Sequence, residues 1–300
     1  MDIPWDDLKL FLAVAETGSL SSAARRLRIG QPTVSRKLAA LEYTLGATLF
    51  RRSAEGATLT SAGERLLEPA RRMAEWAGEA GRVAEARSHA PTGLVRITAA
   101  PFVCFDFVAP FAAWLRQKQP GIRVEVLSAT SHLDLARGEA DLALRLRAPT
   151  QPDLTLLATR THHNAVYVSG AVAKQLPKRP KLTDIPWVAW APPFEDLPPN
   201  PQLRSLVSPF VPSFTSDNFL VLLAAAEAGA GAMVLPRERH RFSRPTKLVR
   251  LPMELGPHAT SDTHLVCAKS ALHIPRVRAV VELLVEELAR KVVSPRATAR

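Results

Sequence analysis

Residues 20–46 of this 300-residue chain read LSSAARRLRIGQPTVSRKLAALEYTLG, and this stretch decides the fold of the N-terminal part. Its apolar residues recur at helical spacing up to Leu27, and Ser21 or Ser22 is expected to cap this helix. Gly30 then interrupts the periodicity and marks a turn. The stretch therefore predicts two helices joined by a tight turn.

The second helix of this pair is predicted to begin at Gln31, with Pro32 in its first turn, where the missing N–H is not needed. One face of this helix carries apolar residues at helical spacing: Val34, Leu38, Leu41 and Leu45. The other face is short, polar and cationic: Pro32, Thr33, Ser35 and Arg36. Two helices arranged in this way have the geometry of a helix-turn-helix whose second helix enters the major groove of DNA.

Positive charge concentrates around these helices. Between Leu20 and Arg52 there are seven Lys and Arg residues against one acid, Glu42, and the whole chain has a formal net charge of +11. Such a segment is expected to face the phosphates of a nucleic acid. The candidate DNA contacts are Ser21, Ser22, Arg25, Gln31, Pro32, Thr33, Ser35, Arg36, Lys37, Arg51 and Arg52.

These candidates are expected to contact DNA in two ways. Gln31 suits pairing with adenine and Arg36 suits pairing with guanine. Arg51 and Arg52 fall on a predicted small wing, where phosphate contact is expected. For a single exposed arginine, such as Arg25, solvation by water alone is the alternative interpretation.

The runs LFLAVAE at 10–16, GSL at 18–20, QPTVS at 31–35, LFRR at 49–52 and LTSAG at 59–63 resemble the winged helix-turn-helix of LysR-type transcriptional regulators. The resemblance assigns residues 1–60 to the DNA-binding domain. It implies a regulator that binds double-stranded promoter DNA as a homodimer or homotetramer, contacts RNA polymerase and responds to a small-molecule effector of unknown identity.

Residues 61–89 are predicted to form a long linker helix, which Thr60 or Ser61 caps. Pro69 is expected to kink or loosen it. An apolar seam runs along this helix and is expected to pair with a second subunit: Leu66, Met73, Trp76, Ala80 and Val83. Packing of the same seam against the chain's own C-terminal domain is the alternative.

Residues 90–300 alternate short apolar runs with helical stretches, so the chain is α/β overall, and this pattern favours mainly parallel sheets. The stretch resembles the LysR effector domain, which is similar to periplasmic binding proteins with two α/β lobes joined by two crossing strands. The resemblance implies a first lobe at about 93–161 and 267–292, and a second at about 162–266.

The same resemblance implies an effector cleft between the lobes. Its expected walls include Ala100, Phe102, Val103, Cys104, Ser128, Ser131, Arg145, Trp190, Thr215, Ser216 and Asp217. Arg145 suits a carboxylate, with a surface or interlobe salt bridge as the alternative. The loop at 99–103 lacks the Ser or Thr that often holds an anionic effector, which favours a flatter, less polar ligand or no tight ligand.

Cofactors, metals and catalysis are not expected. The two cysteines form no ligand cluster, and Cys104 among apolar neighbours favours a core residue over a redox sensor. His162 and His163 are adjacent in a predicted strand, so they point to opposite faces and do not chelate one metal. The sequence has no nucleophile elbow, phosphate loop or dinucleotide-binding glycine pattern, so an enzyme is not expected.

The acidic N-terminus and the absence of a long apolar run favour a cytoplasmic protein without a membrane partner. An effector-independent repressor or an architectural DNA-binding protein remains the alternative function, since the unusual loop at 99–103 leaves the effector open.

Overall fold

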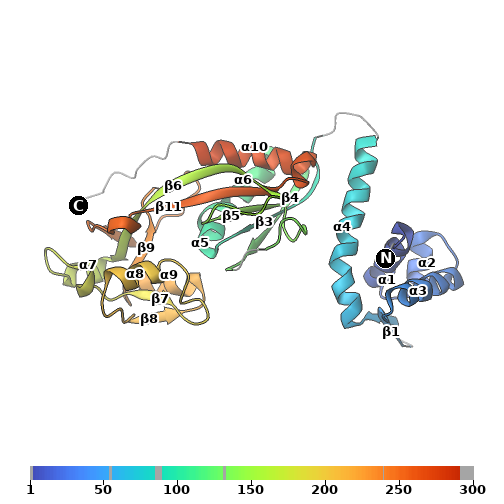
Figure 1. Cartoon of the computed structure of the whole chain (residues 1–300), viewed down its shortest axis with the longest axis horizontal. Helices are drawn as coiled ribbons and strands as arrows, with labels where there is room; N and C mark the ends of the chain where they lie inside the picture. The colour runs from blue at the N-terminus through green and yellow to red at the C-terminus, as the bar shows by residue number, and fades with distance from the viewer. Residues whose placement is uncertain (1–2, 54–55, 85–89, 131–132, 239, 291–300) are drawn as a thin grey trace. The chain divides into compact units, whose positions relative to one another are not determined.

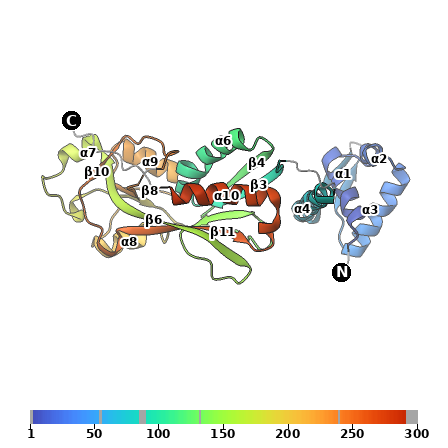
Figure 2. The same ribbon diagram turned by 90° about the horizontal axis from the view of Figure 1, so that it is seen from above.

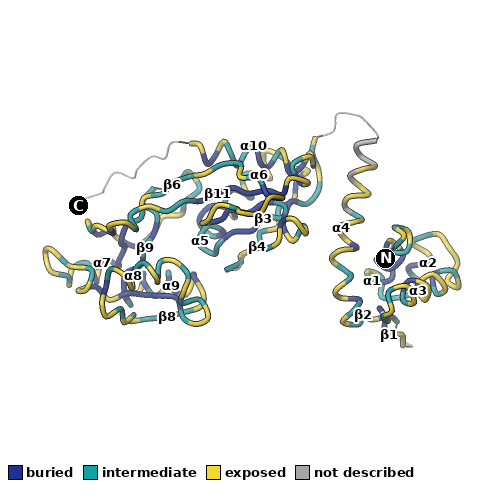
Figure 3. The backbone as a smooth tube through the Cα atoms, in the orientation of Figure 1, coloured by how far each residue is buried: buried dark blue, intermediate teal, exposed yellow. Residues whose placement is uncertain are grey.

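A computed structural model describes residues 3–53, 56–84, 90–130, 133–238 and 240–290, without the side chains of Glu75, Glu79 and 81–84. The chain divides into two units, Met1–His89 and Ala90–Arg300 (Figure 1). Each unit has its own buried apolar core, as the dark segments of the backbone show (Figure 3).

In its described residues, the first unit holds four helices and a two-stranded wing. Its elements are α1 (Trp5–Thr17), α2 (Leu20–Leu27), α3 (Gln31–Leu45), β1 (Phe50–Ser53), β2 (Gly56–Leu59) and α4 (Ser61–Ala84). Gly18 and Gly46 end α1 and α3 in the left-handed conformation, each with a φ of 64°. The predicted start of α3 at Gln31 is confirmed.

The predicted cap of α2 is wrong. This helix begins at Leu20, and the N-cap is Ser19, whose backbone is extended with a φ of −155°. Ser21 and Ser22 therefore lie inside the first turn. At the other end, Arg28 adopts the left-handed conformation, with a φ of 57°, and closes the helix before the turn to α3.

The wing packs closely against the start of α4. The strands pair antiparallel, with Phe50 opposite Leu59. Thr60 caps α4 as predicted, because its Oγ1 accepts a hydrogen bond of 3.2 Å from the Gly63 N–H. A Cβ at Gly63 would collide with the carbonyl oxygen of Leu49, so only glycine fits this contact. The helix continues through Pro69 as one element.

The described part of the second unit contains a seven-stranded sheet in the order β10-β6-β11-β5-β3-β4, with β9 also paired to β6. Its strands are β3 (Gly93–Ala99), β4 (Ile122–Ser128), β5 (Leu142–Arg145), β6 (Leu154–Ser169), β9 (Met233–Pro236), β10 (Leu248–Leu251) and β11 (Thr260–Ala268). A separate pair consists of β7 (Val188–Trp190) and β8 (Phe214–Ser216).

The prediction of mainly parallel sheets is wrong. Only β3 with β4, β3 with β5, and β7 with β8 are parallel among the described strands. Every pairing of β6 and β11 is antiparallel. The reason is that these two long strands run in opposite directions through both lobes, a feature that short apolar runs do not reveal.

The helices of the second unit are distributed over two lobes (Figure 2). The first lobe has α5 (Pro101–Val103), the π-helix η1 (Cys104–Val108), α6 (Ala109–Lys118), η4 (Ala271–His273) and α10 (Pro275–Ala289). The second has α7 (Gly170–Gln175), η2 (Leu182–Asp184), α8 (Asn200–Leu206), α9 (Phe219–Glu227) and η3 (Gly256–His258). Strands β6 and β11 are shared by both lobes.

A segment following β9 crosses to the first lobe. Phe242 packs against the core of that lobe, and the guanidinium of Arg241 lies 4.3 Å from the ring centroid of Trp114. Arg241 also pairs with Glu287 of α10, its Nε donating over 2.9 Å. The two lobes are therefore joined by this segment as well as by the shared strands.

Candidate nucleic-acid interface and ligand cavities

The N-terminal face of α3 is open to solvent. Gln31, Pro32 and Arg36 are exposed, and Thr33 and Ser35 are half-buried. The opposite stripe packs into the core of the unit, where Val34 is fully buried. The apolar stripe thus anchors the helix and leaves its polar and cationic face available to a partner.

The basic side chains of this region differ in what they already contact. In the described part of the chain, Arg36 and Arg51 have neither an ion pair nor a side-chain hydrogen bond. Lys37 Nζ lies 3.6 Å from Asp7 Oδ1, and Arg25 donates over 3.3 Å to Ser22. Arg36 and Arg51, together with the exposed Arg28, are therefore the cations of this group that have no partner among the described residues and are free for an external anion.

Arg52 has a position that its sequence neighbours do not suggest. Its Nη1 donates a 3.1 Å hydrogen bond to Ser35 Oγ, and its Nη2 lies 3.8 Å from Glu42 Oε2. Glu42 in turn accepts hydrogen bonds from the N–H groups of Leu49, over 2.7 Å, and Phe50, over 3.2 Å. Glu42, which the sequence analysis missed as a structural residue, thus links α3 to the wing.

The predicted seam on α4 has two parts. Leu66 departs from the prediction, because it packs against the core of its own unit beside Leu67 and Ala70. Met73 and Trp76 are 42% and 48% exposed, and Ala80 is exposed. The predicted Val83 side chain lies outside the described residues.

The second unit contains a cavity of about 400 Å³, which we call the arginine cavity. It brings together Ala100, Arg145 and Trp190, which are far apart in the sequence. Arg145 is only 7% exposed, and its Nη2 donates a 2.8 Å hydrogen bond to the carbonyl of Leu133. Its Nε has no partner among the described residues, and desolvation lowers the pKa of this guanidinium despite the opposing charge of Asp134.

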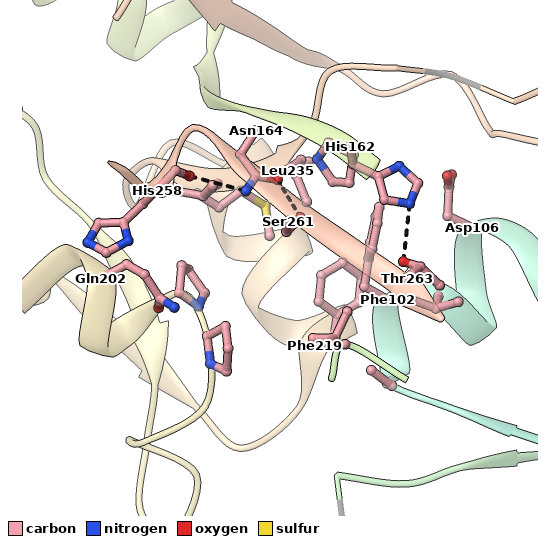
Figure 4. A pocket seen from close by; sticks show the side chains of 18 of the residues that line it. Phe102, Asp106, His162, Asn164, Gln202, Phe219, Leu235, His258, Ser261 and Thr263 are labelled. Atoms are coloured by element: carbon pink, nitrogen blue, oxygen red, sulfur yellow. Dashed lines mark hydrogen bonds between the residues drawn. The ribbon is translucent and has the colours of Figure 1, made fainter. Parts of the chain in front are cut away.

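A second cavity of about 450 Å³ lies between the lobes, and we call it the apolar cavity (Figure 4). Phe102 and Val103 line it. The two cavities share six lining residues: Ala100, Pro101, Leu146, Arg147, Trp190 and Pro198. Phe102 meets Phe219 of α9 edge to face, with ring centroids 5.3 Å apart. The two cavities are therefore neighbours with a common wall.

Several predicted wall residues line neither cavity. Cys104 is a core residue of the first lobe, where its Sγ donates to the carbonyl of Ala99 and burial raises the pKa of its thiol. Ser128 is exposed at the end of β4. Thr215, Ser216 and Asp217 lie at the end of β8, where Ser216 accepts a hydrogen bond from the N–H of the residue that caps α9. Ser131 lies outside the described residues.

The polar side chains of the apolar cavity, which come from β6, β11 and α8, were not predicted from the sequence. His162 Nε2 lies 3.1 Å from Thr263 Oγ1, and Ser261 Oγ donates over 3.1 Å to Asn164 Oδ1. Burial and the nearby Arg160 lower the pKa of His162 to about 4. A signal was present, because polar residues continue through 159–164 and 260–264 where a core strand would be apolar.

Among the described residues, no group of three or more His, Cys, Asp or Glu side chains is placed to hold a metal ion. Within the same part of the chain, no helix combines the length and apolar character needed to cross a membrane.

Two family models match the sequence. The model described as "Bacterial regulatory helix-turn-helix protein, lysR family" matches residues 5–64. The model described as "LysR substrate binding domain" matches residues 88–289, which is more than half of the chain.

Curated relatives match over most of their length. The chain is 30% identical over 250 residues to the HTH-type transcriptional regulator TfdS of Cupriavidus pinatubonensis, which covers 79% of this chain and 84% of that protein. It is 28% identical over 233 residues to the Mau operon transcriptional activator of Paracoccus denitrificans, covering 77% and 79% of the two chains.

Solved structures share the fold. Full-length CbnR, crystallised with its target DNA, has a TM-score of 0.59 at 21% identity and covers 96% of this chain and 100% of its own. Full-length OxyR from Pseudomonas aeruginosa has a TM-score of 0.60 at 18% identity, covering 100% and 99%. Taken with the family models, these likenesses confirm the predicted fold class, and the chain belongs to the LysR family of helix-turn-helix transcriptional regulators and is not an enzyme.

Proposed function

We propose that this regulator reads promoter DNA by placing the N-terminal face of α3 in the major groove. One observation carries this proposal: Arg36 is exposed on that face without a partner among the described residues, directly opposite the buried Val34. Gln31 extends the same face, and Arg51 on the wing adds a free cation for a phosphate.

The assembly is proposed to be a homodimer, or a dimer of dimers, in which α4 pairs with its counterpart. The exposed Met73 and Trp76 support this, because a helix of this length cannot bury such side chains alone. Two recognition helices would then meet successive major grooves. We also propose that the regulator contacts RNA polymerase and that it is located in the cytoplasm, where bacterial promoters lie.

The effector is proposed to bind in the arginine cavity through a carboxylate. A buried guanidinium with an unpartnered Nε and no ion pair among the described residues favours an anion supplied by a ligand. The family match to a LysR substrate binding domain supports an effector-dependent regulator, and nothing in the comparisons supports the architectural alternative.

The experiment that tests this function begins with full-length protein and random DNA, from which bound sequences are selected. Footprinting of the selected site, with and without small carboxylic acids, then measures whether an acid changes the protected region. Arg145→Gln is expected to abolish the response to the acid while DNA binding persists. Binding without sequence preference would refute the DNA proposal, and an undiminished response in Arg145→Gln would refute the effector site.

A further inference from the structure

The wing and helix α3 are joined by a chain of three polar side chains. Arg52 of β1 donates from Nη1 to Ser35 Oγ over 3.1 Å, and its Nη2 lies 3.8 Å from Glu42 Oε2. Ser35 and Glu42 are separated by close to two helical turns, so they lie on one face of α3. Arg52 therefore bridges two points along that face, and we call the three side chains the Arg52 bridge.

The far end of the Arg52 bridge is fixed to the backbone. Glu42 Oε1 accepts hydrogen bonds from the N–H groups of Leu49 and Phe50, where the chain enters β1. The side chain of Glu42 is only 16% exposed, against 43% for Arg52. One oxygen of the carboxylate therefore holds the wing to α3, and the other holds the guanidinium of Arg52.

The hydrogen bond from Arg52 determines what remains free on Ser35. A hydroxyl group has one O–H donor and two acceptor lone pairs. Arg52 occupies one lone pair, and the O–H of Ser35 has no acceptor among the described residues. The Arg52 bridge therefore leaves Ser35 with a donor that is free for an external acceptor.

Glu42 opposes DNA binding by its charge. It is the single acid between Leu20 and Arg52, in a segment that otherwise carries seven Lys and Arg residues. A negative charge there repels phosphates and partly compensates Arg52. The contribution of Glu42 to a DNA-binding surface is therefore the geometry that it imposes on Arg52 and the wing.

We propose that Glu42 and Arg52 are positioning residues, which orient the Ser35 hydroxyl to donate to an acceptor atom on a base edge in the major groove. Such acceptors are N7 and O6 of guanine, N7 of adenine and O4 of thymine. Ser35 lies in the N-terminal part of α3, where recognition helices contact base edges. This inference rests on the placement of α3 proposed above, and it assigns Arg52 to base recognition rather than to phosphate binding.

Glu42→Gln tests the Arg52 bridge in the full-length protein. The amide oxygen still accepts from the backbone, but the charge that holds Arg52 is lost. Binding to random DNA is expected to be unchanged or tighter, because a negative charge is removed, whereas binding to the selected site is expected to weaken. The ratio of the two affinities, measured by competitive binding at fixed salt, is expected to fall at least fivefold. An unchanged ratio would overturn the proposal, and damage to the fold alone would weaken both affinities.

Glu16→Gln is the matched control. Glu16 of α1 forms an ion pair with Arg26 of α2, outside the Arg52 bridge. Its replacement removes the same charge and releases another arginine, so the ratio of affinities is expected to stay as in the unaltered protein. An equal fall in both variants would make charge the cause and would contradict the proposal.

A double-substitution cycle uses exposed or half-buried side chains and does not depend on Glu42. If Arg52 acts through Ser35, the combined Ser35→Ala and Arg52→Ala variant loses no more preference for the selected site than the more affected single variant. Additive losses would mean that Arg52 contacts DNA independently of Ser35. Equal weakening of selected and random DNA by Ser35→Ala would indicate a phosphate contact, and either result would refute the proposal.

Arg52→Lys separates the shape of the side chain from its charge. Lysine keeps the charge but lacks the planar fork that reaches Ser35 and Glu42 together. The variant is expected to bind random DNA as the unaltered protein does and to lose preference for the selected site at least fivefold. A lysine variant that retains the preference would show that the charge alone suffices. If the unaltered protein prefers no sequence, the placement of α3 fails together with this inference, whereas a preference that survives every variant removes only the Arg52 bridge.

Discussion

Arg36 differs from Arg52 because its side chain has no ion pair or hydrogen bond among the described residues. It is exposed on α3, whereas Arg52 is held by Ser35 and Glu42. Arg36→Ala is therefore expected to cost about 1–3 kcal/mol of binding free energy on the selected DNA site, and to relax the base preference at one position. Competitive binding to the selected and to random DNA measures both effects.

Arg51→Ala is the comparison for this prediction. As a phosphate contact, Arg51 should contribute to all sequences alike, and its loss should reduce the salt dependence of binding. If Arg36→Ala weakens binding to the selected site and to random DNA to the same extent, as Arg51→Ala is expected to do, Arg36 does not read a base.

The lowered pKa of His162 predicts that the stability of the protein depends on pH. Its pKa falls from 6.5 to about 4 on folding, so below pH 6.5 the unfolded chain binds a proton that the folded chain rejects. The free energy of unfolding therefore falls as the pH is lowered from 6.5 to about 4. Among the charged neighbours of His162, Arg160 and His240 lower its pKa, and Glu238 and Asp262 raise it.

The replacement His162→Gln keeps a donor for Thr263 and removes the titrating group. Between pH 7 and 4.5 the variant is expected to lose about 2 kcal/mol less stability than the unaltered protein. Urea denaturation at the two pH values, followed by tryptophan fluorescence, measures this difference. An identical loss in both proteins would show that His162 is not the group responsible.

At the scale of single residues, sequence patterns predicted exposure better than contact. The spacing from Val34 placed Arg36 on the open face of α3. The link from Arg52 to Ser35 was not predictable, because it joins side chains 17 positions apart across the wing. Cys104 was assigned to the cleft by position, whereas its apolar neighbours already indicated the core.

The junction of α4 with the wing depends on one glycine. A methyl group at Gly63 would overlap the carbonyl of Leu49 and crowd a methyl of Leu59. Gly63→Ala is therefore expected to destabilise the N-terminal unit by roughly 1–3 kcal/mol, as overpacking does. Thermal unfolding measures the loss. Gly30→Ala is the control, since a Cβ there meets only ordinary contacts, and an equal loss in both variants would contradict this explanation.

Helices with strong local sequence signals were predictable, whereas the long strands that both lobes share were not. Helix α3 has a turn glycine, a first-turn proline and a periodic stripe, and its start was correctly predicted. Strand β6 has 16 residues, of which only the last part is uniformly buried. The sequence pattern placed His162 and His163 in a strand, but it did not reveal that one strand runs from Leu154 to Ser169 through both lobes.

The assembly proposed for the whole molecule depends on α4. Trp76→Glu places a charge on its exposed apolar face and is expected to convert dimers to monomers, at a cost of at least tenfold in DNA affinity. Analytical ultracentrifugation measures the mass. Arg71→Glu is the control, because Arg71 is exposed on another face of the same helix. A dimer that survives Trp76→Glu would place the interface elsewhere.

The shared strands have a consequence for how this molecule responds to a ligand. Strands β6 and β11 pair from Leu154 with Ala268 to His163 with Thr260, with one irregularity between Leu265 and Val266, so a ladder of paired residues passes between the lobes. A wide clamshell closure would break that ladder. Ligand binding is therefore expected to change the twist of one sheet rather than the gap between the two lobes. Small-angle scattering of the full-length protein should record an almost constant radius of gyration on ligand binding, provided that the assembly keeps its mass.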